Sequence, residues 1–227
     1  MDPRFQPLLD RLNALANPAH TAGMARYGIK TESALGISVT TLREMARGVK
    51  SHELAIQLWN TGIHEAQMIA SMVDDHKLVS PDQMESWASD FDSWDICDGV
   101  CGNLFIKTPY AREKAISWCA REEEFVRRAG FAMIAWLAVH EKKVSDDYFL
   151  DFLPLIEKGA EDNRNFVKKA VNWALRQIGK RSPGCWQASM ELCLRLEDNP
   201  SRSVQWVVKD ARKELELKRA AIFNKGK

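Results

Sequence analysis

A repeated segment with matching hydrophobic and basic positions constrains this chain more than any other feature. FVRRA at 125–129 recurs as FVKKA at 166–170, a spacing of 41 residues. An acidic or Asn-containing turn precedes each copy, and a looser third copy begins at Ser203. Each copy opens a stretch in which apolar residues recur at the spacing of one helical face. Such a face has to be buried against a neighbour, so the pattern predicts a stack of similar helical units.

Helical periodicity extends along the whole chain, and the alternation that marks strands is almost absent. Two helices per unit at a period near 41 residues are typical of HEAT and armadillo arrays, and the chain is long enough for about five and a half such units. We therefore predict an all-α fold, a HEAT-like helical repeat solenoid (an α–α superhelix) that forms a single domain over residues 1–227 and has a concave binding wall. Helices are expected near 4–16, 40–48, 51–60, 64–74, 81–88, 94–107, 110–119, 123–140, 146–157, 163–179, 184–196 and 201–219.

Charge, cysteine and hydropathy patterns exclude several classes of protein. The 32 Lys and Arg against 31 Asp and Glu leave a net charge of +1, so DNA binding would require a local basic patch. The five cysteines form no CxxC pair, and no histidine lies at ligand spacing, which predicts reduced thiols and no metal site. The chain has neither a membrane-length apolar run nor the apolar segment of a leader, so we expect a cytoplasmic protein.

The segment 163–179 carries an unusual stripe on the flank of its apolar face. Lys169, Trp173, Arg176 and Lys180 are spaced i, i+4, i+7 and i+11, and six basic residues but no acidic one lie between 164 and 181. A tryptophan among cations suits a surface that follows phosphates. The alternative is that Trp173 covers a groove against a neighbouring helix while the cations are merely solvated.

Arg128 holds the position in its repeat that Lys169 holds in the next one. Equivalent positions of a solenoid line the same wall, so the two cations are expected to form a basic rail. The alternative for Arg128 is an ion pair with Glu124, four residues earlier on the same helix. Other large aromatic residues lie in apolar stripes: Trp59, Trp118 and Trp136 are expected in the core, and Trp87 and Trp186 at helix contacts.

Residues 93–105 form a second segment that its apolar pattern does not fully explain. Ser93 or Asp92 is expected to cap the helix, and Trp94 and Asp98 lie four residues apart on the edge of its polar side. Gly99 and Gly102 each weaken the helix interior by up to about 1 kcal/mol. Two such residues indicate that another part of the structure approaches the helix closely here. The alternative for Asp98 is an ordinary surface carboxylate or an ion pair. The apolar face consists of Ile96, Cys97, Val100, Cys101 and Leu104.

Taken together, these motifs resemble the AlkD-like DNA alkylation repair family, which comprises alkylpurine DNA glycosylases built from HEAT-like repeats. The resemblance runs in order from about residue 20 to about residue 215. It is carried by WDICD at 94–98, Arg128 in FVRRA and Trp173 in KKAVNWALR. The segment MARY at 24–27, followed by LGI at 35–37 and Arg43, resembles the N-terminal motif of the family.

The resemblance implies hydrolysis of the N-glycosidic bond of cationic alkylated purines, such as N3-methyladenine and N7-methylguanine, in duplex DNA. Asp98 falls on the catalytic aspartate, Trp94 and Trp173 on the tryptophans that flank the deoxyribose, and Arg128 on the arginine that approaches the backbone. No lysine is positioned for a Schiff base, so we expect a monofunctional enzyme without a cofactor, a monomer associated with the nucleoid through DNA. The expected DNA-binding residues are Tyr27, Arg43, Lys168, Lys169, Arg176 and Lys180.

The chain departs from the family pattern at two places. Ser93 precedes Trp94 where well-studied members have a second tryptophan, which would loosen an aromatic cleft, and VTT at 39–41 lacks the proline often found before Arg43. Two further hypotheses therefore stay open beside the enzyme. One is a HEAT-repeat protein that binds damaged or branched DNA without cleaving it, and the other is a protein-binding scaffold.

Overall fold

The structure, a computed structural model, describes residues 1–224 and divides the chain into two compact units, Met1–Tyr110 and Ala111–Lys227. Every regular element of the described residues is a helix, which confirms the all-α prediction. The single domain over 1–227 stays a prediction. No helix in residues 1–224 combines the length and the apolar character needed to cross a membrane.

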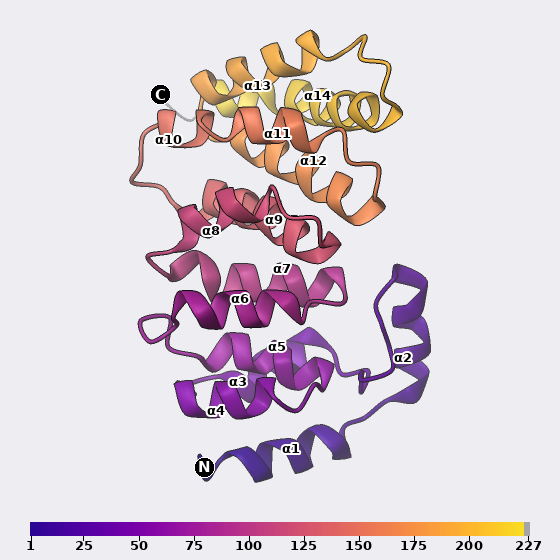
Figure 1. Cartoon of the computed structure of the whole chain (residues 1–227), viewed down its shortest axis with the longest axis vertical. Helices are drawn as coiled ribbons and strands as arrows, with labels where there is room; N and C mark the ends of the chain where they lie inside the picture. Colours follow the sequence, from indigo (N-terminus) through magenta and orange to yellow (C-terminus); the bar gives the residue numbers. More distant parts are fainter. Residues whose placement is uncertain (225–227) are drawn as a thin grey trace. The chain divides into compact units, whose positions relative to one another are not determined.

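The first unit begins with an irregularly spaced set of helices and continues as a regular array (Figure 1). Serine side chains start several of these helices: the hydroxyls of Ser38, Ser51 and Ser80 each accept a hydrogen bond from the backbone N–H three residues later. Its elements are α1 (Phe5–Ala14), α2 (Pro18–Met24), the 3-10 helix η1 (Ala25–Tyr27), α3 (Val39–Ala46), α4 (His52–Trp59), α5 (His64–Val73), α6 (Pro81–Ser89), α7 (Trp94–Asn103) and the 3-10 helix η2 (Phe105–Lys107).

Aromatic stacking dominates the core of the first unit. The rings of Trp59 and Trp87 lie parallel with their centroids 4.0 Å apart, and Phe91 meets Trp59 edge-on. Both tryptophans are buried, and the indole nitrogen of Trp59 donates to the carboxylate of Asp90 at 2.8 Å. The core prediction for Trp59 is thus confirmed, and the indole has the polar partner that a buried tryptophan needs.

The second unit is a stack of helix pairs in which α8 packs on α9, α11 on α12 and α13 on α14 (Figure 1). The longer helix of each pair also contacts the next, because α9 packs on α12 and α12 on α14. Trp118 is fully buried here, as predicted. The elements are α8 (Ala111–Trp118), α9 (Glu124–His140), α10 (Asp147–Leu150), α11 (Leu153–Gly159), α12 (Asn165–Gly179), α13 (Pro183–Arg195) and α14 (Arg202–Phe223).

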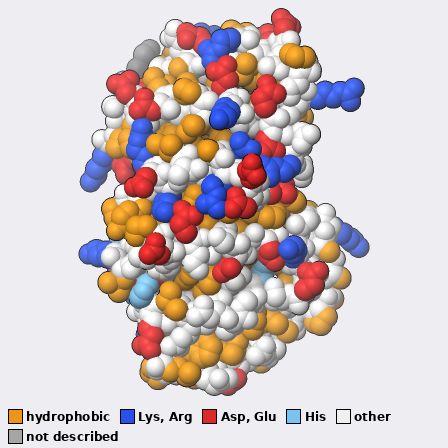
Figure 2. Space-filling model, viewed as in Figure 1, with side chains coloured by type: hydrophobic (Ala, Val, Ile, Leu, Met, Phe, Trp, Pro, Cys, Tyr) orange, Lys and Arg blue, Asp and Glu red, His pale blue; other side chains and the backbone are white. Residues whose placement is uncertain are grey.

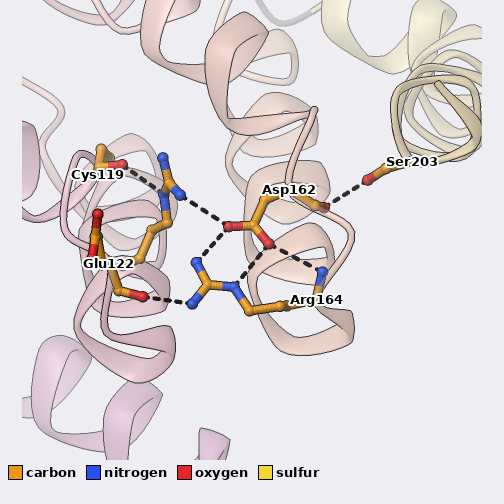
Figure 3. Close-up of polar contacts among 6 residues, drawn as sticks. Cys119, Glu122, Asp162, Arg164 and Ser203 are labelled. Atoms are coloured by element: carbon orange, nitrogen blue, oxygen red, sulfur yellow. Dashed lines mark hydrogen bonds and ion pairs between the residues drawn. The ribbon is translucent and has the colours of Figure 1, made fainter. Parts of the chain in front are cut away.

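Asp162 accepts hydrogen bonds from residues at the starts of α9, α12 and α14 (Figure 3). Its carboxylate accepts hydrogen bonds from Arg127 of α9 and from Arg164 next to α12, while its carbonyl oxygen accepts one from the hydroxyl of Ser203 in α14. Arg164 also donates to the carbonyl oxygen of Glu122 at 2.6 Å. Burial opposes the charge of Asp162, but the hydrogen bonds from Arg164 outweigh it and hold the pKa below its usual value.

The repeat is less uniform than the sequence predicts. The helices α5, α7, α9, α12 and α14 begin 30, 30, 41 and 37 residues apart in order, so the period near 41 holds for one interval. That interval is the longest, and it contains α10 between α9 and α11. The helix expected at 146–157 is in fact α10 and α11, with Pro154 in the first turn of α11. Helix α2, which is short and has no buried residue, was not predicted.

Candidate active site and DNA interface

Helix α7 carries the two residues predicted to surround the scissile bond in the first unit. Ile96, Cys97, Val100 and Cys101 of this helix are buried as predicted, whereas Trp94 and Asp98 are half-buried on its other side. Ser93 occupies the N-cap position, but its side chain makes no capping hydrogen bond, and its hydroxyl donates to the carboxylate of Asp92 at 3.3 Å. Ser93 is fully buried. The helix thus presents one tryptophan and one carboxylate, a helical turn apart, on a single edge.

Trp94 is held by the N-terminal segment of the same unit. Its indole nitrogen donates a hydrogen bond of 3.0 Å to the backbone carbonyl oxygen of Tyr27, the last residue of η1. Gly28 follows in the left-handed region with φ +74°, which turns the chain directly after this carbonyl. The side chain of Tyr27 is 72% exposed, and Arg43 lies exposed on α3. The structure therefore links Tyr27 to Trp94 through the backbone and leaves the phenol accessible.

Asp95, between Trp94 and Asp98 in the sequence, forms a buried pair with a histidine. The imidazole Nε2 of His64, the first residue of α5, lies 2.9 Å from the carboxylate of Asp95. Burial disfavours both charges, but the mutual hydrogen bond and Coulomb attraction outweigh it, so the pKa of His64 is raised and that of Asp95 is lowered. The contact between this imidazole and this carboxylate joins the first turns of α5 and α7.

Glu65, next to His64, organises the loop that contains the sequence LGI. Its fully buried carboxylate accepts hydrogen bonds from the backbone N–H groups of Leu35 and Gly36 at 2.7 Å and of Ile37 at 3.2 Å. Gly36 has φ +77°, and a Cβ there would lie 2.4 Å from the carbonyl oxygen of Asn17. Glu65 was not among the predicted site residues, because a glutamate near a helix start gives no sign in the sequence that it is buried.

A close contact explains one of the two glycines of α7. A Cβ added to Gly99 would lie 2.9 Å from the sulfur of Met68 on α5. The predicted close approach is confirmed at this position. The contact joins α5 and α7 about one turn beyond the pair of His64 and Asp95, so α7 is fixed to α5 at two successive levels.

Arg128 and Trp173, the other two predicted catalytic residues, lie in the second unit on α9 and α12. Arg128 is 6% exposed, and its guanidinium donates to the carbonyl oxygen of Phe166 at 2.6 Å. Trp173 is half-buried and meets Trp136 edge-on, with ring centroids 5.3 Å apart, and Trp136 in turn stacks on His140. Trp136 is therefore half-buried beside Trp173 rather than in the core, which corrects the prediction made for it.

The basic stripe on α12 is partly neutralised by a neighbouring helix. Arg176 and Lys180 both pair with the carboxylate of Glu214 on α14, whereas Lys169 is exposed. The ammonium of Lys168 lies 5.3 Å from the ring centroid of Trp206, also on α14. On the face of the second unit that Figure 2 shows, Lys and Arg side chains are interspersed with Asp and Glu. Arg176 and Lys180 are therefore ion-paired within the unit rather than merely solvated, and their role in DNA binding and the basic wall stay predictions.

Arg128 also departs from the expected basic rail, because it is buried while its equivalent Lys169 is exposed. The predicted site residues thus form two groups. Tyr27, Arg43, Trp94 and Asp98 belong to the first unit, and Arg128, Lys168, Lys169, Trp173, Arg176 and Lys180 to the second. Their roles in catalysis and DNA binding stay predictions.

The cysteines are not placed for nucleophilic chemistry. All five are buried thiols that take no part in a disulfide. Burial raises the pKa of Cys185 to about 11 and that of Cys193 to about 12, and it raises the pKa of Cys119 further still. A thiol becomes a good nucleophile only as the thiolate, so the thiols of Cys119, Cys185 and Cys193 are poor nucleophiles near neutral pH. Within residues 1–224, no group of three or more His, Cys, Asp or Glu side chains is arranged to hold a metal ion.

Comparisons with known proteins agree with this architecture. The chain is similar to a solved structure described as "a new family of proteins related to the HEAT-like repeat DNA glycosylases with affinity for branched DNA structures". The likeness has a TM-score of 0.78 and covers 95% of each chain, and at 21% identity it establishes the fold. No curated protein matches the chain. The family model described as "DNA alkylation repair enzyme" matches residues 8–215, and the chain therefore belongs to the DNA alkylation repair family.

Proposed function

We propose that this protein is a monofunctional DNA glycosylase that hydrolyses the N-glycosidic bond of cationic alkylated purines in duplex DNA. The expected bases are N3-methyladenine and N7-methylguanine. The observation that carries the proposal is the placement of Trp94 and Asp98 on one edge of α7, in a chain that belongs to the DNA alkylation repair family. The indole of Trp94 is fixed to the carbonyl of Tyr27, so the two side chains are presented by a supported helix.

The proposed chemistry needs a fixed negative charge rather than a strong acid. An alkylated purine already carries a positive charge, so it can leave without protonation. The sugar that remains develops oxocarbenium character, which a carboxylate held nearby stabilises while it orients the attacking water. We assign this role to Asp98. The faces of Trp94 and Trp173 favour a cation and would flank the deoxyribose. This reaction requires no cofactor.

The phosphate backbone supplies most of the affinity in complexes of this kind. We assign backbone contacts to the exposed Tyr27, Arg43 and Lys169. The contact of Arg128 at the lesion is proposed from the family resemblance, and its guanidinium would have to leave the carbonyl of Phe166 to make it. Lys168, Arg176 and Lys180 are weaker candidates, because Trp206 or Glu214 already engages them. Because one chain carries all of these residues, we propose that the protein works as a monomer on the DNA of the cytoplasmic nucleoid.

The test is release of the base from a duplex oligonucleotide that carries one N7-methylguanine, under single-turnover conditions. The wild type should release the base, and Asp98→Asn should lower the rate by about 100- to 1,000-fold, the usual effect of losing one electrostatic contact to a transition state. Asp82→Asn, an exposed carboxylate on α6, is the matched control and should leave the rate unchanged. Base release at the wild-type rate by Asp98→Asn would remove Asp98 from the mechanism.

A second candidate function is DNA binding without base release. It is favoured by the description of the similar structure, whose family has affinity for branched DNA. Binding of duplex DNA that falls steeply with added salt, combined with no base release by the wild type, would establish this alternative over the enzyme. Binding of duplex and of four-way-junction DNA should therefore be titrated at two or more salt concentrations beside the release assay.

A further inference from the structure

Helix α14 repeats the unusual stripe of α12 position by position. On α12 the order is cation, tryptophan, cation, cation at Lys169, Trp173, Arg176 and Lys180. On α14 the same order and the same i, i+4, i+7, i+11 spacing occur 33 residues later. The second set, which we call the α14 stripe, consists of Arg202, Trp206, Lys209 and Lys213. Because α12 and α14 pack against each other, the two stripes lie on neighbouring helices of the second unit.

The α14 stripe differs from the first in being exposed along its whole length. All four of its side chains are exposed, and Trp206 keeps 39% of its surface accessible. The opposite side of the helix, which includes Val204, Val207, Val208, Ala211 and Leu215, is buried. In residues 1–224, no carboxylate lies within ion-pair distance of Arg202, Lys209 or Lys213, although Glu214 and Asp210 of the same helix pair with α12. The α14 stripe is therefore a row of unpaired cations around an exposed indole.

The indole of Trp206 already makes a cation–π contact. The ammonium of Lys168 lies 5.3 Å from the ring centroid of Trp206, which orients the ring and brings a fourth cation to it. Trp206 does not belong to the set of buried residues of α14. A large exposed aromatic residue among unpaired cations is the arrangement by which proteins stack a nucleic-acid base and follow its phosphates.

We propose that the α14 stripe binds a single-stranded segment of DNA, with an unpaired base stacked on Trp206 and neighbouring phosphates held by Arg202, Lys209 and Lys213. This inference rests on the proposed action on DNA and extends it. Unpaired DNA is favoured over duplex because paired bases have no free face except at an end. The stripe covers eleven residue steps of helix, about 16 Å, which is long enough to accompany several nucleotides.

The experiment measures equilibrium binding of unmodified DNA by fluorescence anisotropy. Three labelled duplexes of the same sequence are compared: one blunt, one with a single-stranded tail, and one with a tail of abasic nucleotides that has phosphates but no bases. The wild type should bind the tail with bases most tightly. Trp206→Ala should lose about 5- to 150-fold in affinity for that DNA, the range expected for one stacked base, and Trp206→Phe should retain most of it.

Charge variants test the phosphate contacts separately. The double variant Lys209→Gln, Lys213→Gln should reduce the dependence of log K on log salt by about 1.4 for both tails, about 0.7 for each lost phosphate contact. Lys218→Gln removes an exposed lysine of α14 that lies outside the stripe, and it is the matched control. The melting temperature of each variant is measured as a control for folding. It should stay close to that of the wild type, because the substituted side chains are exposed.

Two results would overturn the proposal. One is equal binding of the three DNAs by the wild type, and the other is an equal loss on all three by Trp206→Ala. Both readouts use undamaged DNA, so they do not depend on base release. A preserved tail preference without release of N7-methylguanine would refute the glycosylase alone, and release without the preference would refute only the role of the α14 stripe.

Discussion

Glu65 offers the sharpest test of how the first unit is held together. Its carboxylate is fully buried on α5 and accepts three backbone hydrogen bonds from residues 35–37. Glu65→Gln keeps the volume of the side chain but replaces one acceptor oxygen with an amide that faces the N–H of Leu35. The substitution also removes the charge that strengthens the two bonds from Gly36 and Ile37.

The magnitude follows from these contacts. Hydrogen bonds to a charged group contribute about 1.5–3 kcal/mol, neutral ones contribute about 1, and a buried donor left without a partner costs about 1–3 kcal/mol. We therefore expect Glu65→Gln to lower the free energy of unfolding by about 2–4 kcal/mol. Glu65→Ala should cost more, because all three N–H groups lose their acceptor. Glu44→Gln, an exposed carboxylate on α3, should change stability by less than about 0.5 kcal/mol.

Urea unfolding followed by circular dichroism measures the global effect, and amide hydrogen exchange measures the local one. In Glu65→Gln the amides of residues 35–37 should exchange about 30-fold faster or more, because about 2 kcal/mol of local stability is lost. An unchanged urea midpoint together with unchanged exchange at these amides would refute the reasoning. It would mean that the loop is held by its other contacts, such as the one between His20 and the carbonyl of Gly36.

Two further predictions concern charge. The raised pKa of His64 gives stability that is lost as pH rises through it, and the lowered pKa of Asp95 gives stability that is lost as pH falls through it. The pair should therefore stabilise most between about pH 4 and 6.5, and His64→Gln should cost about 3 kcal/mol there and flatten the pH profile of the urea midpoint. A pH profile of the urea midpoint that runs parallel in His64→Gln and in the wild type would contradict this prediction. Glu214→Gln should release Arg176 and Lys180 and tighten duplex binding at low salt about two- to fivefold, measured by anisotropy, and unchanged binding would show that this part of α12 does not face DNA.

The helices that the sequence predicts well are those with a continuous apolar stripe. For α9 and α14 the expected starts differ from the observed ones by one residue, because a long buried face fixes their position. Helix α2 lacks such a face, and its support comes from Asn17, which caps it, and from the contact of His20 with Gly36. The cap is local, but the contact of His20 with Gly36 joins residues 16 positions apart, and neither leaves a periodic signal.

The site shows the same division between local and long-range information. The spacing of Trp94 and Asp98 places both on one edge of α7, and the structure confirms this. The neutralisation of Arg176 by Glu214 joins residues 38 positions apart, so a window of sequence without acidic residues could not reveal it. Charge counted along one helix describes a surface only when the charges of the packed neighbours are known.

The two carboxylates of α7 illustrate why the support of a site matters as much as its reactive groups. Asp95 lies one residue after Trp94, and its carboxylate is hydrogen-bonded to His64. It therefore holds the helix in place rather than facing solvent. With the contact between Gly99 and Met68 and the hydrogen bond from Trp94 to Tyr27, α7 is held at three points around Asp98. A carboxylate stabilises a developing cation best when it need not reorganise. Substitutions at His64 or Met68 should therefore slow base release, although neither residue is assigned a contact with DNA. Slower release in these variants would distinguish an Asp98 that is held in position from an ordinary surface carboxylate.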